Sequence, residues 1–123
     1  MIAGTICDGA GGASKVPDDV QAERCEVAGM QLQRGTLNVS VNDLNVALKA
    51  LGEAMDETQK DSKVGPLQWW PVKIKWQGEV FSGYVVRHQL SKTKYLEVVS
   101  DTHFRKEGAL DGDAIELVPH KVG

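Results

Sequence analysis

The alternation of apolar and polar residues predicts a chain that is mostly β-structure. Between residues 36 and 41 the two kinds alternate, so Thr36, Asn38 and Ser40 face one way and the apolar residues between them face the other. Similar β-like runs cover residues 1–7, 69–76, 80–86, 95–100 and 114–118. A turn at Gln77-Gly78 joins two of these runs into a hairpin.

The first of two predicted helices follows Pro17. Asp18 and Asp19 suit a helix N-terminus, because anionic side chains offset the positive end of the helix dipole and can accept from free N–H groups. We expect this helix to end at Gly29.

A second helix is predicted to begin after Asn42 as its N-cap. Four apolar residues then recur at intervals of four, three and four, the spacing of one helical face: Leu44, Leu48, Leu51 and Met55. Residues 56–65 are polar and lack periodicity, so they are predicted to form a connecting loop.

These elements favour one small α+β fold that is mainly β. Five or six short strands with two helices in the first half do not alternate as a parallel βαβ sheet requires. A barrel-like arrangement fits them better, and we expect one domain over residues 1–123.

Composition narrows the classes of function. Lys and Arg number 14 against 17 Asp and Glu, and this slightly acidic balance argues against nucleic-acid binding as the main activity. The apolar stretches are only a few residues long, as at 84–86, so no membrane span is expected. Residues 1–12 do not resemble an export signal, and we therefore expect a cytoplasmic protein.

The cysteines and histidines do not form a metal-binding pattern. Cys7 and Cys25 are expected to be free thiols in a reducing compartment. His88, His103 and His120 are scattered rather than paired, which makes a structural zinc site improbable.

A glycine-rich segment follows the first predicted strand. Gly9, Gly11 and Gly12 allow backbone N–H groups to approach a phosphate closely. The segment matches neither the P-loop nor the Rossmann pattern, so a plain flexible loop remains the alternative.

Three polar residues on predicted strands are candidates for chemistry. Thr36 and Asn38 point the same way and offer two hard oxygens of the kind that Mg²⁺ prefers, although exposed polar residues are common on strands. Glu97 is a carboxylate in an apolar strand, where burial would raise its pKa toward that of a working base. The alternative for Glu97 is a solvent-facing side chain.

Two further groups allow either a ligand or a structural role. His103, Arg105 and Lys106 follow the strand of Glu97 and can serve a charged ligand or simply lie on the surface. All three tryptophans fall within residues 69–76; at least one is expected in the core, and another can stack on a flat ligand.

The order of these motifs resembles the CTP-dependent riboflavin kinase family. The most specific matches are GTLNV at residues 35–39 and EVVSDTHFRKEGALDGDAIEL at residues 97–117, and the resemblance covers nearly the whole chain. It implies a six-stranded cradle-loop β-barrel with two inserted helices. It also implies transfer of the γ-phosphate of CTP, with Mg²⁺, to the 5′-hydroxyl of riboflavin to give FMN.

The resemblance assigns roles to individual residues. Thr36 and Asn38 would hold Mg²⁺, and Glu97 with Ser91 or Thr93 would contact the flavin. The residues implied to bind the nucleotide are Ala10, Gly11, Gly12, Ala13, Ser14, Lys15, Thr102, His103, Phe104 and Arg105. In phosphoryl transfer, Arg105 would stabilise the transferred group and Glu97 would orient and deprotonate the hydroxyl.

The chain also departs from this family. Ala13 and the residues 14–16 stand where the family has a third glycine and an aromatic residue, and residues 32–34 replace an approach that contains proline. A barrel that only binds a nucleotide, a flavin or a partner protein is therefore the alternative.

Overall fold

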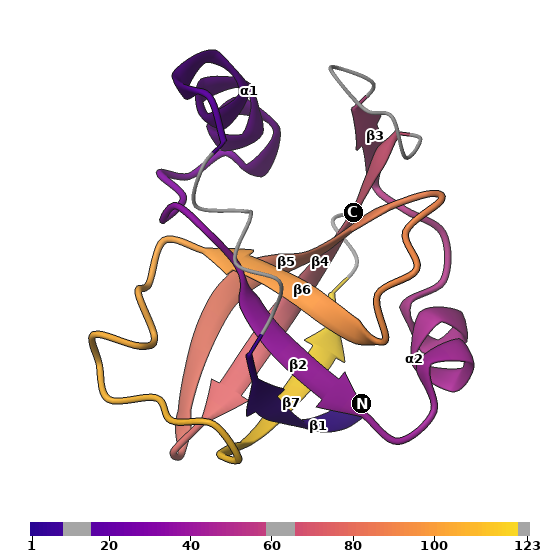
Figure 1. Ribbon diagram of the computed structural model, residues 1–123, viewed down its shortest axis with the longest axis vertical. Coiled ribbons are helices and arrows are strands. Elements are labelled where there is room, and N and C mark those ends of the chain that lie inside the picture. The colour runs from indigo at the N-terminus through magenta and orange to yellow at the C-terminus, as the bar shows by residue number, and fades with distance from the viewer. Residues whose placement is uncertain (9–15, 59–65, 121–123) are drawn as a thin grey trace.

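The computed structural model describes residues 1–8, 16–58 and 66–120, and Figure 1 shows the helices beside a strongly curved sheet. In chain order the elements are β1 (Ile2–Cys7), α1 (Asp18–Ala28), β2 (Leu37–Val41), α2 (Leu44–Leu51), β3 (Asp56–Thr58), β4 (Leu67–Trp76), β5 (Glu79–His88), β6 (Tyr95–Ser100) and β7 (Ala114–Pro119).

Six strands close into an antiparallel β-barrel. They follow one another around the ring in the order β4-β5-β6-β2-β1-β7, and β7 pairs back onto β4 between residues 72–75 and 116–119. The short strand β3 pairs with residues 67–69 of β4, outside the ring. The predicted α+β fold, mainly β with a six-stranded barrel and two helices, is confirmed.

Alternating residues of the strands fill the barrel. On β4 the side chains of Trp70, Val72, Ile74 and Trp76 belong to one buried cluster with Val39 of β2. This cluster is the main core of the fold.

A second buried cluster lies on the outer wall and attaches α1 to it. Ala28 and Leu32 pack against Trp69, Val86 and Val99, which come from β4, β5 and β6. Helix α1 ends as predicted at Gly29, which adopts a left-handed conformation with φ of 67°. Figure 1 shows α1 beside the barrel, and this position brings its side chains close to β6.

All three tryptophans are buried. Trp69, Trp70 and Trp76 are 0%, 6% and 4% exposed. The expectation of at least one core tryptophan is confirmed, and none of the three presents an open ring face for a flat ligand to stack on.

The details of α2 differ from the prediction. The N-cap is Asp43, not Asn42, because the Asp43 carboxylate accepts from the backbone N–H of Val46 at 3.2 Å. The helix ends at Leu51, since Gly52 has a φ of 75° that breaks the helical path before Met55.

The predicted loop over residues 56–65 is wrong at its start. Asp56–Thr58 form β3, because the edge of β4 offers backbone partners to a segment that has no apolar periodicity of its own. Residues 59–65 lie outside the described residues.

Both cysteines are free and half-buried, which confirms the predicted free thiols. None of the helices in the described part of the chain is long and apolar enough to cross a membrane.

Candidate functional site

The register of β2 and β6 places two of the predicted site residues side by side. Asn38 lies directly opposite Glu97, while their neighbours Leu37 and Val98 are paired and buried in the barrel. Directly opposite residues of antiparallel strands project to the same face, with Cβ atoms about 4.5–5.5 Å apart. Asn38 and Glu97 therefore share the outer wall of the barrel.

Thr36 joins this pair. Its hydroxyl Oγ1 donates to Asn38 Oδ1 at 2.9 Å, and both side chains are half-buried. Two neighbouring oxygens in an octahedral Mg²⁺ shell, each about 2.0–2.1 Å from the ion, are themselves about 2.9 Å apart. The hydrogen-bonded separation of the two oxygens therefore coincides with the spacing of adjacent Mg²⁺ ligands.

A metal at this position would depend on neutral protein oxygens. Within residues 1–8, 16–58 and 66–120, no cluster of three or more His, Cys, Asp and Glu residues is arranged to hold a metal ion. Mg²⁺ is commonly held by one or two protein ligands together with water and substrate phosphates. Thr36 and Asn38 fit that mode of binding, and Glu97 is the nearest candidate for a charged neighbour.

Glu97 lies where the outer wall meets α1. Burial raises the pKa of its carboxyl group, and His88, Arg24 and Arg87 oppose this by favouring the charged form. Arg24 comes from α1, and burial lowers the pKa of its guanidinium while Glu97 and Glu23 oppose that shift. The carboxylate is therefore desolvated but faces basic groups from α1 and β5.

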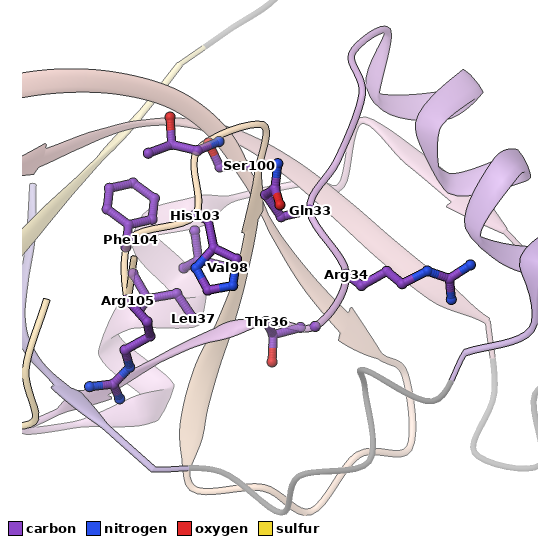
Figure 2. Close-up of a pocket in the computed structure, with 11 residues that line it drawn as sticks. Gln33, Arg34, Thr36, Leu37, Val98, Ser100, His103, Phe104 and Arg105 are labelled. Atoms are coloured by element: carbon purple, nitrogen blue, oxygen red, sulfur yellow. The ribbon is translucent and has the colours of Figure 1, made fainter. Parts of the chain in front are cut away.

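A pocket opens between the segment before β2 and the segment after β6 (Figure 2). Its volume is about 90 Å³, and its lining includes Thr36 together with Thr102, His103, Phe104 and Arg105. Ligand sites for whole small molecules typically measure about 300–1,000 Å³. The described pocket therefore has room for a part of a nucleotide, such as one phosphate group.

Residues that the sequence reasoning missed form the opposite wall of this pocket. The backbone N–H of Gln33 donates to Ser100 O at 2.9 Å, and its side-chain Nε2 donates to Asp101 O at 3.1 Å. Arg34 donates to Val16 O at 2.7 Å and pairs with Asp18, so it extends toward α1 in Figure 2. No sequence motif identifies Gln33 and Arg34 as pocket residues, because only contacts with distant segments of the chain give them this position.

Phe104 lines the pocket but is committed to the core. Its ring makes edge-to-face contacts with Trp76 at 5.9 Å and with Phe81 at 5.0 Å between centroids. The turn that follows is closed by backbone hydrogen bonds, and Lys106 N donates to Nδ1 of His103 at 3.2 Å. The buried ring therefore anchors the turn that presents His103 and Arg105.

Arg105 is held at the end of β1. Its guanidinium donates to Asp111 Oδ1 at 2.5 Å and to Cys7 O at 3.4 Å, and it lies 3.9 Å from Asp8. This places a cation at the point where the chain enters the glycine-rich segment. The predicted nucleotide-binding residues 10–15 themselves lie outside the described residues.

Ser91 and Thr93 are not brought into the pocket. They belong to the connection between β5 and β6, whereas Thr102 to Arg105 follow the other end of β6 (Figure 1). A six-residue strand spans roughly 17 Å. The structure thus separates the predicted flavin hydroxyls from the pocket by the length of β6, with Glu97 between them.

No family model matches the chain, and the search of curated proteins returned no match either. The family assignment consequently stays a prediction from the sequence motifs.

Proposed function

We propose that this barrel is a phosphotransferase that moves the γ-phosphate of CTP to the 5′-hydroxyl of riboflavin, giving FMN. The observation that carries the proposal is the shared location of Thr36, Asn38 and Glu97 on one patch of the outer wall. An oxygen pair that can hold Mg²⁺ beside a desolvated carboxylate suits phosphoryl transfer to an alcohol, where a metal ion neutralises phosphate charge and a base orients the hydroxyl.

Thr36 and Asn38 would hold the Mg²⁺. When bound, the ion would neutralise charge on the phosphates of the nucleotide. The neutral Thr36 and Asn38 side chains leave the ion most of its charge, because they add none of their own.

Glu97 would act on the acceptor hydroxyl. As the bond forms between the 5′-oxygen and the γ-phosphorus, the bond from that phosphorus to CDP breaks and the hydroxyl proton passes to the Glu97 carboxylate. Burial raises the pKa of this group, which brings its proton affinity closer to that of a base working near neutral pH.

Arg105 would stabilise the transferred group. Its hydrogen bonds to Asp111 and to Ala109 O hold the guanidinium in one place before any ligand arrives. Preorganised donors of this kind stabilise developing charge without reorganisation during the reaction.

A cytoplasmic location is also part of the proposal, because residues 1–12 do not resemble an export signal.

The alternative function is a barrel that binds a nucleotide, a flavin or a partner protein without turnover. The ion pair between Arg105 and Asp111, which already occupies the guanidinium within the fold, favours this alternative. This alternative predicts ligand binding and no product.

The test is FMN formation by the purified protein with riboflavin, Mg²⁺ and each of CTP, ATP, GTP and UTP. Product with CTP alone supports the full proposal, and product with another triphosphate corrects the donor. A melting shift with flavin or nucleotide but no product supports the binding alternative. No response to any of these ligands rejects both.

A double variant, Thr36→Ala with Asn38→Ala, tests the metal assignment. It removes both oxygens and is expected to abolish Mg²⁺-dependent turnover. Ser40→Ala is the matched control, because Ser40 is exposed on the same face of β2 two residues away. Persistent turnover in the double variant would reject Thr36 and Asn38 as the metal ligands.

A further inference from the structure

The connection between β5 and β6 is organised by one arginine. Arg87 Nη1 donates to Thr93 Oγ1 at 3.0 Å, while Nη2 donates to Ser91 O and to Thr93 O, each at 3.1 Å. Arg87, Ser91 and Thr93 are all half-buried. A planar fork with donors on two nitrogens suits this set of three acceptors, and the single ammonium of a lysine does not.

We propose that Arg87 is a positioning residue for the acceptor substrate, and that it acts by fixing the Ser91–Thr93 segment so that the Ser91 hydroxyl faces the flavin. This inference rests on the proposed function for the identity of that substrate.

The hydrogen bonds distinguish Ser91 from Thr93. The Thr93 hydroxyl accepts from Arg87 and donates to Tyr95 O at 3.3 Å, so its proton is already used within the fold. The Ser91 hydroxyl accepts from Thr93 N at 3.3 Å and lies 3.2 Å from Thr93 Oγ1. Its proton can turn from Thr93 to a ligand at little cost, because a serine hydroxyl rotates freely.

Arg87 also connects this segment to Glu97. Its charge is one of those that favour ionised Glu97, so the guanidinium that binds the segment also lies near this carboxylate. Charge and hydrogen-bond geometry must therefore be separated in any test of Arg87.

Arg87→Lys separates the two effects. Lysine keeps the positive charge but loses the fork, so the riboflavin Kd and KM are expected to rise roughly tenfold, as for the loss of one to two net hydrogen bonds. The KM for the nucleotide and kcat are expected to stay within about twofold, because the charge near Glu97 remains. A merely structural role would instead lower the melting temperature and alter all the kinetic constants together.

A second pair of variants keeps the test decisive if Arg87→Lys does not fold. Thr93→Val removes the hydroxyl that accepts from Arg87 and is expected to weaken riboflavin binding in the same direction. Lys92→Ala is the matched control, because Lys92 is exposed in the same connection, and its Kd should be close to that of the native protein.

Riboflavin binding is measured by quenching of flavin fluorescence, without any nucleotide. Weaker binding by Arg87→Lys or Thr93→Val supports the inference even if the native protein shows no kinase activity, in which case only the proposed function fails. FMN formation with unchanged riboflavin binding in these variants overturns the inference and leaves the proposed function standing. Absence of riboflavin binding by the native protein also overturns the inference.

Discussion

Substitution of Phe104 by leucine tests whether this residue serves the core or the ligand. The sequence motifs predict a nucleotide contact for Phe104, but the structure packs its ring against Trp76 and Phe81 with 4% of the residue exposed. Leucine keeps an apolar side chain at this position while removing both edge-to-face ring contacts. The substitution therefore separates aromatic packing from simple burial.

The expected cost follows from the two lost ring contacts. Each aromatic pair contributes about 0.5–1.5 kcal/mol beyond area burial, so Phe104→Leu should lower the free energy of unfolding by about 1–3 kcal/mol. For a chain of this size, each kcal/mol shifts the melting temperature by about 4 °C, which gives a decrease of roughly 4–12 °C. Turnover should fall as well, because the ring anchors the turn that carries His103 and Arg105.

The assay combines thermal and urea unfolding with nucleotide titration. Leu110→Ala is the matched control, because Leu110 is 67% exposed in the same connection and should change stability by less than about 0.5 kcal/mol. A native melting temperature for Phe104→Leu together with weaker nucleotide binding would refute the core assignment and restore the ligand contact.

Four other substitutions test the fold and the proposed base. Asp43→Ala removes the N-cap of α2 and should lower the free energy of unfolding by about 0.5–2 kcal/mol, measured by urea unfolding. Asn42→Ala should leave the free energy of unfolding unchanged. The reverse result would restore Asn42 as the N-cap. Gly83→Ala should lower the free energy of unfolding by about 1–3 kcal/mol, because its Cβ would lie 2.5 Å from Val99 O; an unchanged free energy of unfolding would show that these strands lie further apart. Because the pKa of Glu97 is raised, its carboxyl group stabilises the fold most below its usual pKa of 4.5, and this contribution is lost as the pH rises through the raised value. Glu97→Gln should therefore melt at or above the native temperature at neutral pH while turnover falls about 10²–10⁴-fold; a lower melting temperature or native turnover would contradict this reasoning.

Local pattern was sufficient for most of the elements. Alternation over residues 36–41 predicted β2, and the acidic pair after Pro17 with Gly29 predicted both ends of α1. The predictions failed where contact with another segment of the chain decides the local structure. Residues 56–58 form a strand only because the edge of β4 is available to pair with them.

The candidate site was predicted in pieces rather than as an arrangement. Thr36 directly precedes β2 and Asn38 is the second residue of that strand, so an extended backbone alone places their oxygens together. Their position beside Glu97 depends on the register between β2 and β6, which no local pattern encodes. The core position of Phe104 could not be predicted either, because its aromatic partners Trp76 and Phe81 come from β4 and β5.

The amino-acid sequence by itself determined the six barrel strands, the two helices and the residue types that can perform chemistry, because these depend on the side-chain period and on local backbone preferences. The tertiary structure alone decided which of those residues meet. Barrel closure sets the register that pairs Asn38 with Glu97, and the packing of α1 on the outer wall brings Arg24 to the same carboxylate. Arg87 could not be recognised in advance, because its three hydrogen-bond acceptors come together only when the chain turns between β5 and β6.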